Sequence, residues 1–322
     1  MTSLEPKFDC LCAGIVVADF ICAPITHVPE AGGLVMTESI SLASGGCAAN
    51  VALALARLGR KAAVAGRVGD DMPGRFVRGE LAAGGIDTTH LEETPGTPTS
   101  GTLVINVRNQ DRRFIHAFGA NGLVDGSEIA ADLVPKTRAF YVGGFGLMPR
   151  LAADRVVSVF KAAREAGVRT VLDVVIPDPR RCREELGQVL PWTDVFLPNA
   201  DEGRLLTGLA DPLEQARQFR AAGAATVVIT CGSEGAVLAS PTETFRAAAY
   251  PVAFVDGTGS GDAFAAGYIS GMLDGAAPER CLAIGSALGA SCVRRAGATT
   301  GVFTQTELDE FLSQQHLAID RL

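Results

Sequence analysis

A glycine-rich segment directly before a predicted helix is the part of the sequence best suited to chemistry. It reads Asp256-Gly257-Thr258-Gly259-Ser260-Gly261-Asp262, and the predicted helix covers Asp262–Leu273. Backbone N–H groups at such a helix start point toward one spot, where the positive end of the helix dipole also favours an anion such as phosphate. A carboxylate beside an anion needs another task, so Asp262 would accept a proton from an attacking hydroxyl group. On spacing alone, an ordinary helix cap is the alternative.

Two further clusters could bind small ligands. Gly45 and Gly46 precede a predicted helix and let a ligand approach the backbone, with Asn50 placed to reach a bound polyol. Asn199 and Glu202 follow a predicted strand, where a carboxylate can hold Mg²⁺ through water near phosphates. Helix–sheet packing is the alternative for the first cluster, and helix capping is the alternative for the second.

Other nucleotide-binding motifs are absent from the sequence. A dinucleotide fingerprint, Gly-x-Gly-x-x-Gly, would need glycine at the position of Phe264. No Gly-Lys dipeptide occurs, which excludes a Walker A loop, and the His-Arg-Asp and Asp-Phe-Gly motifs of protein kinases are missing as well. A Rossmann-type oxidoreductase is therefore disfavoured.

Short apolar runs alternate with longer amphipathic segments along most of the chain. Strands are predicted over Cys10–Val17, Ala62–Val68, Ala139–Gly143, Thr170–Val175, Val195–Pro198 and Thr226–Thr230. Helices are predicted over Ala48–Leu58, Gly74–Ala83, Ala152–Ala166, Pro212–Ala222, Asp262–Leu273, Pro278–Arg294 and Thr306–Gln315. This alternation predicts an α/β/α fold, with a mostly parallel central sheet between two layers of helices.

Two segments break the alternation. Thr97–Val107 and Arg112–Phe118 flank the polar turn 108–111 and predict a β-hairpin. Residues 21–42 also lack a helical period and contain two prolines and two consecutive glycines. We expect both segments, 21–42 and 97–118, to project from the main body and to cover a site as a lid. No linker divides the chain, so a single domain over 1–322 is expected.

The composition excludes several classes of protein. Thirty-six acidic against 28 basic residues give a net charge of −8, which argues against a nucleic-acid or anionic-membrane binder. No run of about 18 apolar residues occurs, so no membrane span is expected. The eight cysteines form no Cys-x-x-Cys pair and the four histidines are scattered singly, so we expect free thiols in the cytoplasm.

Four short motifs together resemble those of the PfkB (ribokinase-like) carbohydrate kinases. Gly45-Gly46-x-x-x-Asn50 is similar to the first signature, and Asp256-x-Thr258-Gly259-Ser260-Gly261-Asp262 to the second. Asn199-x-x-Glu202 resembles the family's magnesium-organising motif, and Thr230-x-Gly232-x-x-Gly235 resembles its nucleotide turn. The motifs occur in the family's order along nearly the whole chain. The resemblance implies a ribokinase-like fold whose lid is a small β-sheet.

The resemblance also implies a role for each matched residue. Asp262 would be the general base, and the backbone of Gly259, Ser260 and Gly261 would form the anion hole for the γ-phosphoryl group. Glu202 would hold Mg²⁺ through water. The other roles are Mg²⁺ and phosphate binding by Asn199, nucleotide binding by Thr230, Gly232 and Gly235, and sugar binding by Asp19, Gly45, Gly46 and Asn50.

The chain departs from the family pattern in several places. Cys47 stands where ribokinases have lysine, which weakens ribose as the specific substrate. Asp173 begins an Asp-x-Asn-x-Arg motif that the following residues do not continue. Asp256, Thr258 and Gly297 match positions that bind K⁺ in many relatives, although a serine of that K⁺ site is missing.

The implied activity is that of a kinase that uses ATP and Mg²⁺ to phosphorylate a hydroxyl group of a small sugar or sugar-like alcohol. A nucleoside kinase is the alternative within the family, with Phe20, Phe118 or Phe145 as a candidate apolar shelf for the base. A non-catalytic sugar or nucleotide sensor on the same fold is the alternative outside the enzymes.

The lid carries two further expectations. Acceptor specificity depends on which lid side chains reach the pocket, and the candidates are His116, Asn106 and Asn121. The lid is also, by analogy with the family, the expected contact surface of a homodimer.

Overall fold

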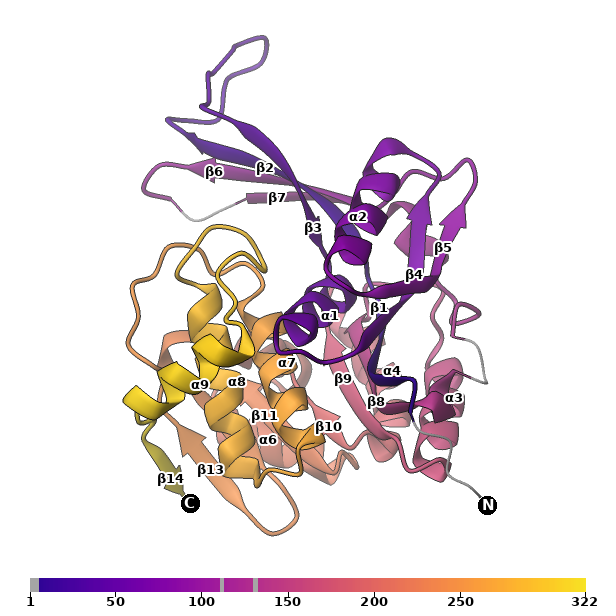
Figure 1. The fold of residues 1–322 in the computed structure, drawn as a ribbon, viewed down its shortest axis with the longest axis vertical. Coiled ribbons are helices and arrows are strands. Elements are labelled where there is room, and N and C mark those ends of the chain that lie inside the picture. The colour runs from indigo at the N-terminus through magenta and orange to yellow at the C-terminus, as the bar shows by residue number, and fades with distance from the viewer. Residues whose placement is uncertain (1–5, 111–112, 130–132) are drawn as a thin grey trace.

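A large sheet forms the centre of the molecule, with the strand order β14-β13-β12-β11-β10-β9-β8-β1-β4-β5 (Figure 1). The computed structural model describes residues 6–110, 113–129 and 133–322. Strands β11 to β5 in this order are parallel, whereas β12, β13 and β14 are antiparallel. The strands are β1 (Phe8–Gly14), β4 (Ala62–Gly69), β5 (Asp87–Thr94), β8 (Thr137–Phe145), β9 (Arg169–Val174), β10 (Val195–Phe196), β11 (Thr226–Thr230), β12 (Ala236–Ala239), β13 (Thr244–Ala247) and β14 (Ile319–Arg321).

Helices cover both faces of this sheet, because each amphipathic helix buries one apolar side against the strands. One face carries α1, α2, α7, α8 and α9, and the other carries α3, α4, α5 and α6 (Figure 1). The helices are α1 (Cys47–Arg57), α2 (Met72–Ala83), α3 (Ala153–Glu165), α4 (Pro179–Val189), α5 (Ala200–Thr207), α6 (Pro212–Ala221), α7 (Ser260–Leu273), α8 (Pro278–Cys292) and α9 (Gln305–Gln314). The predicted three-layer fold with a mostly parallel sheet is confirmed.

Helix α7 lies in the interior of its layer and is buried along most of its length. Its close contact with α8 depends on small residues, since a Cβ at Gly267 would lie 2.8 Å from the carbonyl oxygen of Ile284. The packing fixes the position of the N-terminus of α7. The glycine-rich segment therefore ends on a rigid element.

A separate four-stranded sheet has the order β3-β2-β6-β7, and we call it the small sheet. Its strands are β2 (Val17–Ile25), β3 (Ile40–Gly45), β6 (Gly101–Val107) and β7 (Arg113–Ala117). Strand β2 pairs in parallel with β6, so the two segments predicted to project from the body meet in one sheet (Figure 1). Asp111 and Arg112 of the predicted hairpin lie outside the described residues.

The boundary of the first predicted strand, Cys10–Val17, was wrong. The structure divides this apolar run between β1 in the large sheet and β2 in the small sheet. Only Ile15 and Val16 join the two, and the side chain of Asn121 takes the place of a strand partner there. The Val16 N–H donates to Asn121 Oδ1 (3.2 Å), and Asn121 Nδ2 donates to the Val16 carbonyl (3.0 Å).

Several elements were not predicted from the sequence. Helix α4 was missed because it is strongly charged, although Cys182, Leu186 and Val189 give it one buried apolar side, and edge strand β5 carries mostly polar residues. The short strands β12, β13 and β14 extend the sheet beyond β11 by antiparallel pairing. All eight cysteines are free thiols. In the described part of the chain, no helix has the length and apolar character needed to cross a membrane.

Candidate active site

The N-terminus of α7 has the geometry predicted for an anion site. Gly259 caps the helix in the left-handed region (φ 74°), and a Cβ there would lie 2.5 Å from the carbonyl oxygen of Ala298. The Ser260 hydroxyl donates to the Gly257 carbonyl (3.0 Å), which closes the turn. A Cβ at Gly261 would meet no atom within 4 Å, so the space beside the first helical turn is open to a ligand. The N–H groups of that turn have no partner within the helix.

Asp262 lies in this first turn, and its side chain contacts helix α1. Its Oδ2 accepts a hydrogen bond from Asn50 Nδ2 (2.8 Å), and the Cys47 thiol lies beside the carboxylates of Asp262 and Asp173. Burial raises the pKa of Asp262, and the contacts with Asn50 and Cys47 oppose the rise. A carboxylate in these surroundings binds a proton more readily than one in water, as a general base requires.

A cavity of about 160 Å³ opens directly at Asp262. Six of the residues predicted for the site line it: Asn199, Glu202, Thr230, Gly259, Gly261 and Asp262. The other lining residues are Cys47, Asp173, Val174, Val175, Leu197 and Phe264. The structure thus joins the predicted anion, magnesium and nucleotide segments at the carboxyl ends of β9, β10 and β11.

Asp173 is the functional candidate that the sequence interpretation did not assign. It lies near the end of β9, and its Oδ2 accepts a hydrogen bond from the Tyr141 hydroxyl (3.1 Å). Side-chain ligand atoms of Cys47, Asp173 and Asp262 lie within 4.8 Å of one another. The signal in the sequence was an acidic residue near the end of an apolar predicted strand, where the family's Asp-x-Asn-x-Arg motif also begins.

Glu202 completes the acidic side of the cavity. Burial raises its pKa to about 7, and the charges of Asp262 and Asp201 add to the rise. Burial also raises the pKa of Asp173, with further contributions from Glu202 and Asp262. Like charges this close disfavour one another unless a cation lies among them. Carboxylate oxygens are the ligands that Mg²⁺ prefers, so Asp173 and Glu202 fit a magnesium site.

The alternative of helix capping is also present at this end of α5. Asn199 Oδ1 accepts from the Glu202 N–H (2.9 Å), and Glu202 Oε2 accepts from the Asn199 N–H (2.9 Å). This capping box holds the Glu202 carboxylate at the cavity wall and engages only one of its two oxygens. Capping and ligand binding are therefore compatible.

The predicted nucleotide turn follows β11. Thr230 lines the cavity, and the Cys231 N–H donates to the Gly235 carbonyl (2.8 Å) to close the turn. Gly232 (φ 57°) and Gly235 (φ 92°) both adopt left-handed backbone conformations. Nothing lies within 4 Å of a Cβ placed at Gly232, so the turn leaves free space on that side. Only Thr230 of the three predicted residues borders the cavity itself.

The predicted sugar-binding residues meet on the other side of Asp262. Asp19 lies on β2, and a Cβ at Gly45 would collide with its carboxylate. Gly46 (φ 90°) also has no room, because a Cβ would lie 2.5 Å from the Ile15 carbonyl oxygen. Burial and the charge of Asp262 raise the pKa of Asp19 to about 6, against a hydrogen bond from Thr102.

The three residues predicted for K⁺ are also brought together. Asp256 Oδ1 accepts from the Thr258 N–H (3.0 Å) and hydroxyl (2.8 Å), and Oδ2 accepts from the Gly297 N–H (2.9 Å). The Cys292 thiol lies within hydrogen-bond distance of the carbonyl oxygens of Thr258 (3.2 Å) and Ala298 (3.1 Å). These contacts hold the loop before α7, and K⁺ binding there stays a prediction.

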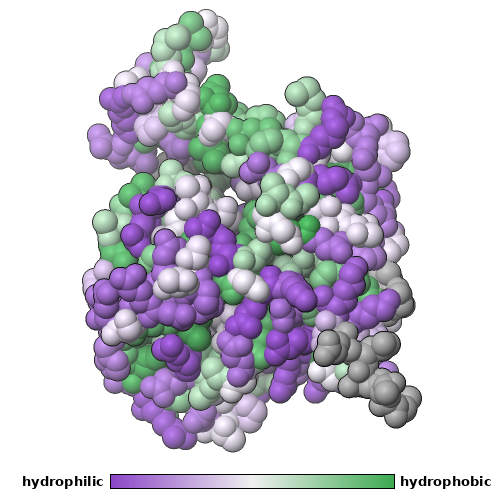
Figure 2. Space-filling view, in the orientation of Figure 1, coloured by the Kyte–Doolittle hydropathy of each residue, from purple (hydrophilic) through white to green (hydrophobic). Residues whose placement is uncertain are grey.

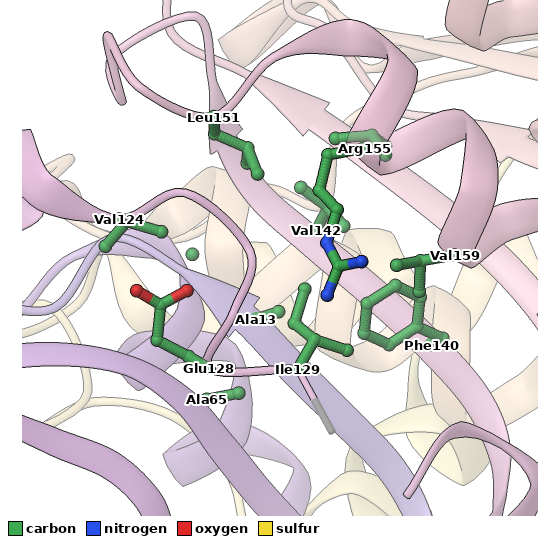
Figure 3. A pocket seen from close by; sticks show the side chains of 12 residues that line it. Ala13, Ala65, Val124, Glu128, Ile129, Phe140, Val142, Leu151, Arg155 and Val159 are labelled. Carbon is green, nitrogen blue, oxygen red and sulfur yellow. The ribbon is translucent and has the colours of Figure 1, made fainter. Parts of the chain in front are cut away.

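A second cavity lies away from these residues, between the large sheet and α3 (Figure 3). Its volume is about 10 Å³, the space of a single water molecule. Apart from Glu128 and Arg155, the side chains labelled in Figure 3 are apolar. It is a packing void with no predicted site residue.

Comparisons with known proteins agree with the arrangement. The model of the pfkB family of carbohydrate kinases matches residues 7–305. The chain is 30% identical to 2-dehydro-3-deoxygluconokinase of Bacillus subtilis over 321 residues (96% of this chain and 97% of the relative). It is 30% identical to aminoimidazole riboside kinase of Salmonella typhimurium over 289 residues (85% and 89%).

The solved structures include Arabidopsis thaliana ribokinase in complex with ribose and ATP. That structure superposes with a TM-score of 0.82 at 25% identity, covering 96% of this chain and 99% of the ribokinase. Fold, motif order and family match all agree. The chain therefore belongs to the pfkB family of carbohydrate kinases and is a phosphotransferase that acts on a sugar or nucleoside hydroxyl group.

Proposed function

We propose that the protein transfers the γ-phosphoryl group of ATP to a hydroxyl group of a small sugar or sugar-like alcohol, with Asp262 as general base. The observation that carries the proposal is the position of Asp262. It lies between the open N-terminus of α7 and the sugar-side residues Asp19 and Asn50. An acceptor hydroxyl held there would face the transferred phosphoryl group and the base together.

Each part of the site has a task in this transfer. The N–H groups of Gly261 and Asp262 would stabilise charge on the phosphoryl oxygens, because the packing of α7 fixes them, whereas the Ser260 N–H donates to the Gly257 carbonyl (3.3 Å). The turn after β11 holds the nucleotide through Thr230, Gly232 and Gly235. Asp173 and Glu202, which line the same cavity, would hold Mg²⁺, which when bound neutralises phosphate charge. Asp256 and Thr258 would support K⁺ beside the anion hole.

The small sheet is proposed to act as the lid of a single domain over 1–322. It brings Asp19 to the site, and closing it over the acceptor would exclude water and suppress hydrolysis of ATP. Its outer face is apolar: Phe20, Leu103 and Ile115 lie in one cross-strand row and are 37%, 40% and 62% exposed. We propose that this face joins two copies of the chain.

A nucleoside acceptor is the alternative, and one residue favours it. Phe118 follows β7, is 46% exposed, and packs edge to face against His116. Phe145 is in the core and Phe20 is on the opposite face from Asp19, so neither offers a shelf for a base. A panel of sugars and nucleosides, scored by release of ADP, separates the two acceptor classes.

The test of the base is Asp262→Asn. We expect kcat to fall by about 10²–10⁴-fold, because the acceptor proton loses its base, while ATP binding measured by calorimetry survives. Asp309→Asn is the matched control, since that exposed carboxylate lies on α9 and accepts a hydrogen bond from Gln305. Unchanged turnover in Asp262→Asn would exclude the proposed role. No ADP release with any acceptor, despite ATP binding, would favour the sensor.

A further inference from the structure

We propose that the acceptor is a neutral polyhydroxy compound and that His116 selects it by accepting a hydrogen bond from one of its hydroxyl groups. The inference rests on the proposed kinase function and deepens it by naming the substrate class. It distinguishes a neutral sugar or polyol from a sugar acid or a sugar phosphate.

The argument begins with a row of polar residues across the small sheet. Asp19 on β2 is in register with Thr102 on β6, and Thr102 is in register with His116 on β7. Side chains in register across neighbouring strands lie on the same face of a sheet. That face looks toward the body, because the neighbouring row of Phe20, Leu103 and Ile115 lies on the opposite, exposed face. The charge of Asp262 also acts on Asp19. Figure 2 shows a notch between the small sheet and the body below it.

We infer the position of each proton in this row from the groups that it joins. The Thr102 hydroxyl donates to the Asp19 carboxylate, which can only accept. Thr102 Oγ1 also lies 3.0 Å from His116 Nδ1. A hydroxyl has one proton, so Oγ1 must accept from Nδ1–H. In a neutral ring this leaves Nε2 with a lone pair, and burial lowers the pKa of His116, which keeps the ring neutral.

Several buried side-chain polar atoms lack a partner in the described structure, and two of them lie on the acceptor side of the site. They are His116 Nε2 and Asn50 Oδ1. Asn50 is only 5% exposed, and because its Nδ2 donates to Asp262, its free atom is the amide oxygen. A buried acceptor without a partner costs about 1–3 kcal/mol, so a ligand that supplies donors is favoured there.

Hydroxyl groups supply the hydrogen-bond donors that the acceptor side of the site lacks. Asp19, Asn50 Oδ1 and His116 Nε2 all accept, and a polyol offers several O–H donors. A carboxylate or phosphate offers only further lone pairs. It would also face the charges of Asp19 and Asp262, and among the described residues no lysine or arginine contributes to the pKa shift of either group. An anionic acceptor is therefore disfavoured by both hydrogen bonding and charge.

The experiment compares matched acceptors with the full-length protein. ADP release is measured with an aldose, its alditol and its aldonic acid, for both five- and six-carbon chains. We expect the neutral compounds to exceed the acids by at least about 100-fold in kcat/KM. His116→Leu should raise KM for the best neutral acceptor by about 5–100-fold and change kcat little, as expected for one lost hydrogen bond. His116→Gln should recover part of the loss, because its amide oxygen accepts.

His316→Leu is the matched control, since His316 is exposed between α9 and β14. Thermal unfolding of each variant shows that the fold is intact. A preference for the aldonic acids, or an unchanged KM in His116→Leu, overturns the inference while leaving the kinase function in place. If no acceptor releases ADP, the proposed function fails, and calorimetric binding of aldose against aldonic acid then decides the inference alone.

Discussion

Four carboxylates lie around one site, those of Asp19, Asp173, Glu202 and Asp262. Burial raises the pKa of each, and the charges of neighbouring carboxylates add to the rise for Asp19, Asp173 and Glu202. In the absence of ligands this arrangement costs stability, because ionised groups are held where they are poorly solvated. The same arrangement suits a protein whose ligands bring a cation and many hydroxyl donors. Binding and folding are thus linked through the charges of these residues.

Asp19→Asn tests this linkage through the pH dependence of stability. The folded chain holds the Asp19 proton up to about pH 6, whereas the unfolded chain releases it near pH 3.8. Ionisation of Asp19 therefore lowers the free energy of unfolding as pH rises from about 4 to 6, by about 2–3 kcal/mol when complete. Removing the carboxyl should stabilise the apo protein at pH 7.5 and change it little at pH 4.

Urea unfolding of wild type and variant at the two pH values measures the difference. Asp309→Asn, on an exposed carboxylate of α9, is the control for removing a surface charge. The same stability difference at both pH values would contradict the shifted pKa.

Individual site residues were predicted from the sequence where a motif was continuous. Asp262, Asn199 and Glu202 belong to such motifs, and all three line the cavity. Thr102 and the position of Asp173 beside Cys47 were not predicted, because their contacts join segments far apart in the chain. The register of β6 with β7 brings Thr102 beside His116, and the folded chain brings Asp173 beside Cys47.

At the scale of elements, the start of α7 combines two glycines with different physical demands. Gly259 adopts a left-handed conformation and packs against the backbone of Ala298, whereas Gly261 faces open space. The first position serves the shape of the turn. The second keeps the approach to the helix N-terminus clear.

Gly259→Ala and Gly261→Ala should therefore fail in different ways. Gly259→Ala should lose both activity and about 1–3 kcal/mol of stability. An alanine is strained at this positive φ, and its Cβ would collide with Ala298. Gly261→Ala should keep its stability but lose activity, because the added methyl group occupies the proposed phosphoryl space. Thermal unfolding and ADP-release kinetics on both variants check this. Equal loss of stability in the two would refute the distinction.

Elements with a clear apolar period were predicted within a few residues. The buried strands β4, β8, β9 and β11 are examples, as are α1 and α8. The end of β1 was missed because Ile15 and Val16 are as apolar as the strand before them. Nothing in a run of apolar residues indicates which of two sheets each residue joins. Helix α4 was missed although Asp178 and Pro179 are a typical helix start.

At the scale of the molecule, the body would supply the phosphoryl side of the proposed site, and the small sheet would supply Asp19, Thr102 and His116 on the acceptor side. The outer face of the small sheet remains apolar and exposed, and Figure 2 shows hydrophobic surface over the region of β2 and β3. A contiguous apolar face of this kind is typical of a contact between proteins.

Ile115→Lys tests whether this face joins two copies. We expect a dimer for the wild type and a monomer for the variant in light scattering, because a buried lysine without a partner opposes association. Leu205→Lys is the control, since Leu205 is 49% exposed on α5 in the body. A monomeric wild type, or an unchanged dimer in Ile115→Lys, would rule out this interface.

The two-residue joint at Ile15 and Val16 has a consequence for the size of acceptor that the site can hold. Asn121 clamps Val16 on both backbone groups, so the small sheet leaves the body from a fixed pivot. Asp19 is three residues beyond that pivot, and Asp262 stays with the body. Any swing of the sheet must change the gap between these two carboxylates. The angle at which the small sheet closes would therefore set the distance between Asp19 and Asp262, and with it the length of acceptor that fits between them.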